Sequence, residues 1–108
     1  MSAPQAQPLA ALLASHPEEC AAVVAVLACY DALDGRSTSG IVEDAEHYSA
    51  DIVLDVGEVG VICDACCSAG FAELDRWGDY SITERADRYA IARMGAASWL
   101  RERVAPCG

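Results

Sequence analysis

The sequence predicts a small, mainly α-helical domain with a single β-hairpin in its second half. Three observations lead to this fold class. The chain has 108 residues, which is the length of about one domain. Apolar residues recur at helical spacing over most of that length, and two short alternating segments flank a turn signal. We therefore divide the chain into a flexible N-terminal arm, residues 1–14, and a single domain, residues 15–108.

The first predicted helix follows directly on the arm, in which residues 9–14 can form a short helical turn. Residues 15–18, Ser-His-Pro-Glu, have the form of a capping box, whose serine accepts a hydrogen bond from a free backbone N–H. Proline is tolerated in a first helical turn, where its missing N–H is no loss. These signals predict a helix over residues 17–33. Asp34-Gly35 ends it, because glycine suits the left-handed position after a helix.

Two more helices are predicted before the hairpin. Residues 36–40 form a polar loop, and residues 41–48 form a short helix. Asp55 is placed to cap a further helix over residues 56–69, although two glycines near its start each cost about 1 kcal/mol relative to alanine. The apolar face of this helix, which we expect in the core, consists of Val56, Val59, Ile62, Cys63 and Cys66.

The hairpin and a long helix complete the predicted domain. Residues 71–74 and 80–82 alternate as strands do, and the turn signal lies between them at residues 75–79. Thr83 then opens a long C-terminal helix that runs to about residue 104. Its apolar stripe consists of Ala86, Tyr89, Ala90, Met94, Ala97, Leu100 and Val104.

Two stretches around the hairpin resemble the winged helix-turn-helix domains of transcriptional regulators. In residues 66–74, a small-Gly-apolar step ends the third helix and enters a wing strand. In residues 80–85, Tyr-Ser-Ile-Thr-Glu-Arg, the second wing strand runs into a helix start. The resemblance covers roughly residues 17–104. It implies a third helix that reads bases in the major groove and a C-terminal helix through which two copies dimerise.

The charge balance restricts how such a domain could meet DNA. The chain has 17 acidic residues and 7 basic ones, all arginine, for a net charge of −10 and a pI of about 4.3. These values exclude a free-standing basic nucleic-acid binder. The predicted third helix holds Asp55, Glu58 and Asp64 and no Arg, Lys, Asn or Gln. We therefore assign contact with DNA or with a partner to Arg76, Trp77, Arg85 and Arg88.

The acidity itself has three explanations. It can be an adaptation to high salt, a consequence of a GC-rich genome, or a functional surface that attracts basic partners or imitates DNA. Trp77 likewise has two interpretations, since it can be a packing residue of the hairpin as well as a contact residue.

Five of the seven arginines lie in the predicted last helix. One interpretation is a solvated helix face with salt bridges. The other is a self-association surface in which the apolar stripe packs on a second copy. The dimerisation residues would then be Tyr89, Met94, Ala97, Leu100 and Val104.

The six cysteines occur in a pattern that argues against a metal site. There is one C-x-x-C motif, at residues 63–66, whereas zinc and iron–sulfur sites need about four converging ligands. We therefore predict no metal and no cofactor, and we interpret most cysteines as small core residues. The candidates for thiol redox sensing are Cys63, Cys66, Cys67 and Cys107.

No sequence feature supports catalysis. The chain lacks a nucleophile elbow, a P-loop and a dinucleotide fingerprint, and His16 and His47 lie among carboxylates as surface histidines do. It also lacks a secretory signal and an apolar run of membrane-spanning length, so a cytoplasmic location is predicted. The hypotheses are a dimeric, DNA-associated regulator, an acidic module that binds a basic protein, and a redox-responsive regulator. The sequence identifies neither a DNA site nor a partner.

Overall fold

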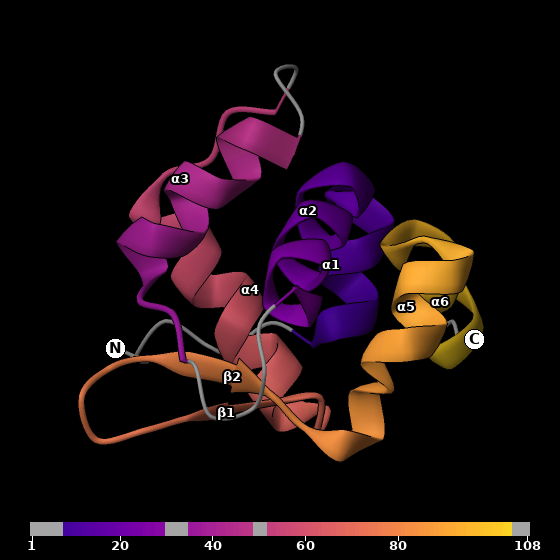
Figure 1. The fold of residues 1–108 in the computed structure, drawn as a ribbon. Helices are drawn as coiled ribbons and strands as arrows, with labels where there is room; N and C mark the ends of the chain where they lie inside the picture. The colour runs from indigo at the N-terminus through magenta and orange to yellow at the C-terminus, as the bar shows by residue number, and fades with distance from the viewer. Residues whose placement is uncertain (1–7, 30–34, 49–51, 105–108) are drawn as a thin grey trace, which may run out of the picture.

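A computed structural model describes residues 8–29, 35–48 and 52–104 of the protein. Over these residues the chain is mainly α-helical with a small two-stranded antiparallel hairpin, as predicted (Figure 1). The elements are α1 (Leu9–Ser15), α2 (Pro17–Ala28), α3 (Thr38–Tyr48), α4 (Val56–Ser68), β1 (Ala72–Leu74), β2 (Tyr80–Ile82), the short 3-10 helix η1 (Glu84–Ala86), α5 (Arg88–Met94) and α6 (Ala96–Arg103). None of the helices in these ranges is long and apolar enough to cross a membrane.

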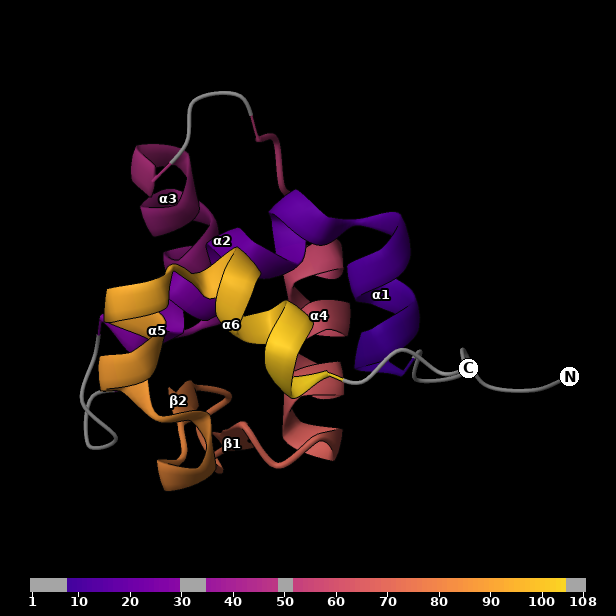
Figure 2. The same cartoon turned by 90° about the vertical axis from the view of Figure 1, so that its right-hand side faces the viewer.

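Helix α2 is the centre of the core. It contacts α1, α3, α4, α5, α6 and β2, with α3 and α4 on one side and α5 and α6 on the other (Figures 1 and 2). Cys20, Ala22 and Val23 are completely buried in it. A helix that is apolar on most of its circumference is stable only when neighbours cover it on several sides. The run of alanine, valine and cysteine in α2 therefore specifies a central helix with close neighbours.

The hairpin is held to the helices by both backbone and side-chain bonds. In its register Ala72 pairs with Ile82, and Leu74 pairs with Tyr80. On the other edge of β2, Tyr80 and Arg36 exchange backbone N–H to O=C bonds of 2.7 and 2.8 Å. The Tyr80 hydroxyl also donates to Asp64 Oδ1 on α4 at 2.6 Å, and burial together with this bond raises the Tyr80 pKa. The hairpin consequently bridges the segment before α3 and the body of α4.

The turn and the entry of the hairpin follow the predicted chemistry. Asp75 Oδ1 accepts from the backbone N–H groups of Trp77 and Asp79 at 2.8 and 3.0 Å, which closes the turn. At the end of α4, Gly70 takes a φ of +86°, which glycine adopts without steric cost. Thr83 Oγ1 donates to the Gly70 carbonyl at 2.5 Å, so the exit of β2 is tied to the entry of β1.

The N-terminal prediction needs two corrections. Residues 9–14 form most of α1, so the short helical turn expected there is confirmed, but it packs on the domain through the buried Leu9 and Leu12 instead of belonging to a flexible arm. Ser15 does not cap α2. It ends α1, and its Oγ donates to the Ala11 carbonyl at 2.9 Å, while His16 occupies the N-cap position without a side-chain capping bond.

The boundaries of α2 and α3 also differ from those predicted. Helix α2 ends at Ala28 instead of residue 33, because the Cys29 N–H bonds to the Val26 carbonyl and tightens the last turn. Residues 30–34, where the predicted end lies, are outside the described residues. Helix α3 begins at Thr38 instead of residue 41, since Ser37 Oγ accepts from the Gly40 N–H at 3.2 Å and starts the helix within the expected loop.

The prediction of one long C-terminal helix is wrong. The segment after Thr83 is divided into η1, α5 and α6 by two residues with positive φ, Asp87 at 46° and Gly95 at 86°. Asp87 Oδ1 accepts from the Ala90 N–H at 3.2 Å and so caps a new helix. These two breaks let α5 and α6 pack against each other and against α2.

Candidate functional site on α4 and the adjoining pocket

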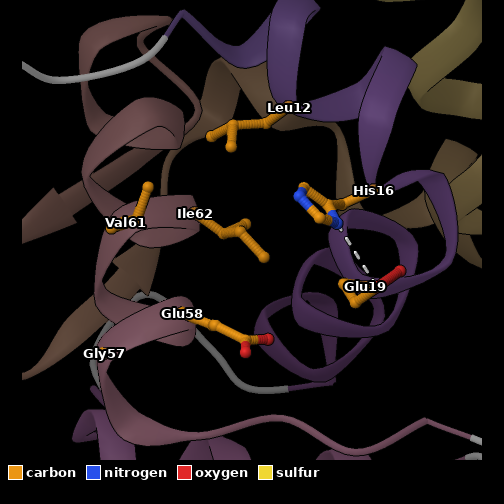
Figure 3. Close-up of a pocket in the computed structure, with 7 residues that line it drawn as sticks. All are labelled: Leu12, His16, Glu19, Gly57, Glu58, Val61 and Ile62. Atoms are coloured by element: carbon orange, nitrogen blue, oxygen red, sulfur yellow. Dashed lines mark ion pairs between the residues drawn. The ribbon is translucent and has the colours of Figure 1, made fainter.

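A pocket of about 460 Å³ lies between α1, α2 and the first half of α4 (Figure 3). Its floor is apolar. Leu12 from α1 and Ile62 from α4 point into the hollow from different elements, and both are almost completely buried. Val61 continues the apolar wall toward the outside, where it is 43 % exposed. The pocket therefore offers an apolar surface that reaches solvent at one end.

The remaining lining of the pocket is polar and carries two carboxylates. His16 and Glu19 lie on the α2 side, with His16 Nδ1 3.6 Å from Glu19 Oε2. Glu58 projects from α4 on the facing side, as Figure 3 shows. Gly57 completes the lining next to Glu58. Both carboxylates line the pocket, so its polar lining is acidic.

Exposed apolar and acidic residues also occur before α4 and along its first half. We define the acidic–apolar face as Val53, Asp55, Val56, Glu58 and Val61. Its three valines are 87, 50 and 43 % exposed in chain order. Asp55 Oδ1 accepts from the Glu58 N–H at 2.7 Å, so Asp55 caps α4 as predicted and stays at the surface.

Helix α4 buries a narrower stripe than predicted. Val59, Ile62, Cys63 and Cys66 are in the core, but Val56 is half exposed and was wrongly assigned there. Val56 is the first residue of α4 and is 50 % exposed, whereas Val59, three residues later, is completely buried. The covered part of the apolar stripe therefore begins at Val59.

Arg76 and Trp77 lie together at the tip of the hairpin. Trp77 is 75 % exposed, so it does not pack within the hairpin. Its ring centre lies 4.9 Å from the Arg76 guanidinium carbon, in range of a cation–π contact. Arg85 lies at the other end of β2, against Gly70, and the Arg88 guanidinium carbon lies 5.6 Å from the centre of the Tyr89 ring. Of these four predicted contact residues, the structure places Arg76 and Trp77 in contact with each other.

The predicted dimerisation residues do not share one face. Leu100 is completely buried in the core of its own domain, whereas Tyr89 is 73 % exposed. Met94 is also at the surface, and Ala97 and Val104 are half-buried. The break at Gly95 separates the two groups, because the stripe was drawn for one continuous helix.

The cysteines of the C-x-x-C segment are packed against the core. Cys63 and Cys66 are buried, and burial raises the pKa of both thiols, to about 12 for Cys66. Cys67 is half-buried, and desolvation raises its pKa as well. The reactive form of cysteine is the thiolate, so these environments favour the unreactive thiol. Cys107 lies outside the described residues. Within the described ranges, no three His, Cys, Asp or Glu side chains are arranged to hold a metal ion.

Sequence reasoning missed the pocket. Val61 carried the available signal, because it is an apolar residue outside the buried stripe of α4. His16 and Glu19 were noted as neighbours, but their position opposite Glu58 depends on how α2 packs against α4. Comparison of the chain with protein-family models, with curated proteins and with solved structures found no match.

Proposed function

We propose that this protein is a non-enzymatic, winged-helix interaction module that binds a basic and partly apolar segment of another protein. The observation that carries the proposal is the acidic–apolar face, in which three exposed valines and the exposed Asp55 and Glu58 occur between residues 53 and 61. Exposed apolar groups that lie together mark interaction sites on soluble domains. The carboxylates between them select a partner with positive charge.

The winged-helix assignment is supported by the order and pairing of the elements. Three helices, α2 to α4, precede the hairpin, and the Gly70 turn leads directly from α4 into β1. Arg36, in the segment between α2 and α3, pairs through its backbone with Tyr80 and so adds a short third strand position beside β2. Arg36 is held there by its side chain, which donates to Asp44 Oδ2 at 2.7 Å.

The chemistry of α4 favours a protein over DNA as its ligand. A DNA-reading helix presents arginine, lysine, asparagine or glutamine to base edges and phosphates. Helix α4 has none of these, and it exposes Glu58 and Asp64.

The cytoplasm, where thiols stay reduced, suits a chain in which the described cysteines are free.

The test uses two peptides of one composition. In the first, arginines and leucines are spaced three and four residues apart so that both lie on one face of a helix, and in the second the order is scrambled. Fluorescence anisotropy should show tighter binding of the amphipathic peptide, and Val53→Ser combined with Val56→Ser should weaken it about tenfold, equivalent to about 1.4 kcal/mol. Leu74→Ser removes an apolar side chain from β1 that is 52 % exposed, close to the 50 % of Val56, and is the control. Equal binding of both peptides, or equal loss in the control, would contradict the proposal.

A second candidate function is DNA association through the hairpin. Arg76 and Trp77 favour it, because a stacked arginine at an exposed wing tip can reach a phosphate or the minor groove. Binding to a mixed-sequence DNA duplex should then weaken on Arg76→Ala and with rising salt. Absence of duplex binding both at low salt and at molar KCl would remove this candidate.

A further inference from the structure

We propose that the pocket between α1, α2 and α4 holds one arginine side chain of the basic partner. The inference rests on the proposed function and names the recognition element of the same surface. Glu58 and Val61 belong both to the pocket and to the acidic–apolar face, so a segment lying on that face passes the mouth of the pocket.

The floor of the pocket fits the aliphatic part of such a side chain. Leu12 and Ile62 form an apolar surface that is buried on its far side and open toward the pocket. Arginine places its methylene stem along apolar surface and keeps its charged end near water. The volume of about 460 Å³ lies in the range of about 300–1,000 Å³ typical of ligand pockets. The pocket therefore has room for the methylene stem of an arginine side chain and for the first ordered waters around it.

The mouth of the pocket fits the guanidinium group. Glu19 and Glu58 approach it from two different helices (Figure 3). The 3.6 Å separation of His16 Nδ1 from Glu19 Oε2 is too long for a hydrogen bond, which leaves the Glu19 oxygens able to accept. Within the described part of the chain, the Glu58 carboxylate forms no ion pair.

Two carboxylates on separate helices favour arginine over lysine. A guanidinium has five donors in a fixed plane and can bridge two acceptors, whereas an ammonium is a compact and strongly hydrated point charge. The partner side chain should therefore donate to Glu19 and Glu58 together. Its stem should lie on Ile62.

The experiment uses n-butylguanidinium chloride as a minimal arginine side chain. In a ¹H–¹⁵N NMR titration we expect saturable shifts centred on the Gly57, Glu58 and Val61 amides, with a Kd on the order of millimolar. Guanidinium chloride, which lacks the stem, and n-butylammonium chloride, which lacks the planar head, should bind several-fold more weakly at equal ionic strength. Shifts spread over the whole surface, or equal binding of the butylammonium ion, would overturn the assignment.

Matched variants locate the charge. Glu58→Gln keeps the size of the side chain and should raise the Kd of butylguanidinium about three- to tenfold, and adding Glu19→Gln should abolish saturation. Glu73→Gln removes another exposed carboxylate from β1, at the far end of α4, and should leave the Kd within about twofold. A thermal melt of each variant separates loss of binding from loss of fold. An equal effect of Glu73→Gln would show nonspecific attraction and overturn the pocket.

The two proposals fail in different ways. If the amphipathic peptide binds the acidic–apolar face but butylguanidinium does not enter the pocket, the arginine inference is wrong and the interaction module stands. If neither peptide binds, the proposed function is wrong. The assignment of the pocket to an arginine of a partner is then wrong as well, even if butylguanidinium itself binds.

Discussion

Replacement of Leu100 by alanine tests whether this residue belongs to the core of the domain or to a dimer interface. The Leu100 side chain is completely buried, on a helix that packs against α2. Leu→Ala changes at such positions cost about 2–5 kcal/mol, because transfer energy is lost and a cavity remains. Since nothing but this domain's own core covers Leu100, we expect a cost of about 3 kcal/mol. For a domain of this size that lowers the Tm by about 12–24 °C.

The assay is urea unfolding followed by far-UV circular dichroism, at low and at high protein concentration. If Leu100 belongs to the core, its free-energy loss is the same at both concentrations, because no second copy contributes to it. Met94→Ala is the matched control, since Met94 comes from the same predicted stripe but is 37 % exposed. We expect its cost to stay below about 1 kcal/mol.

One result would refute the reasoning. If Leu100→Ala destabilises the protein no more than Met94→Ala does, or only at the high concentration where a dimer is populated, then Leu100 contacts a second copy. The predicted dimer would then use the buried half of the stripe. A homodimer through the exposed half, around Tyr89, is compatible with the fold and would appear as a concentration-dependent transition in the wild type.

Three further outcomes follow from particular contacts. Asp55→Ala should cost about 1 kcal/mol in urea unfolding and Asp55→Asn much less, because only the alanine removes the acceptor for the Glu58 N–H. Trp99 is fully buried, and its Nε1 has no hydrogen-bond partner among the described residues, so Trp99→Phe should cost less than half of the about 3–5 kcal/mol expected for Trp99→Ala. Burial raises the pKa of Cys20 to about 11 and of Cys66 to about 12, above the value near 9 of an unfolded thiol. The unfolded chain therefore loses these protons first, so stability should be full below about pH 8 and should fall between about pH 9 and 11 by about 1.4 kcal/mol per pH unit per thiol. Cys20→Ala should remove the contribution of one thiol to the slope of the unfolding free energy against pH. An unchanged slope would contradict the raised pKa of the Cys20 thiol.

Signals that act within a few residues of each other predicted the local structure well. The Asp55 cap, the turn closed by Asp75 and the glycine at position 70 are each determined by the backbone geometry of one short segment. The same holds for the two strands, whose alternation and spacing are visible in the sequence. These are the features from which the hairpin and the start of α4 were predicted.

Features that depend on packing between distant segments were not predictable in the same way. Asp87 looks like an ordinary helix residue in the sequence, yet it takes a left-handed conformation so that α5 can turn against α2. Val56 continues the apolar period of α4, but it is half exposed while Val59, three residues later, is completely buried. Helical periodicity shows which residues share a face and leaves open which turns of that face are covered. The pocket arises from the same cause, because its two carboxylates come from helices that meet only in the folded chain.

The position of the apolar groups separates the three explanations of the acidity. Adaptation to salt, or a biased genome, accounts for carboxylates on the surface, but neither requires exposed valines among them. At molar salt the Debye length is about 3 Å, so charge at a distance no longer attracts a partner. A guanidinium held in contact with Glu19 and Glu58 over an apolar floor is screened less, because its binding depends on desolvation as well as on charge. Binding to the acidic–apolar face should therefore weaken less steeply with salt than the net charge of −10 suggests. The affinity that remains at molar salt measures how much of the acidity serves partner binding.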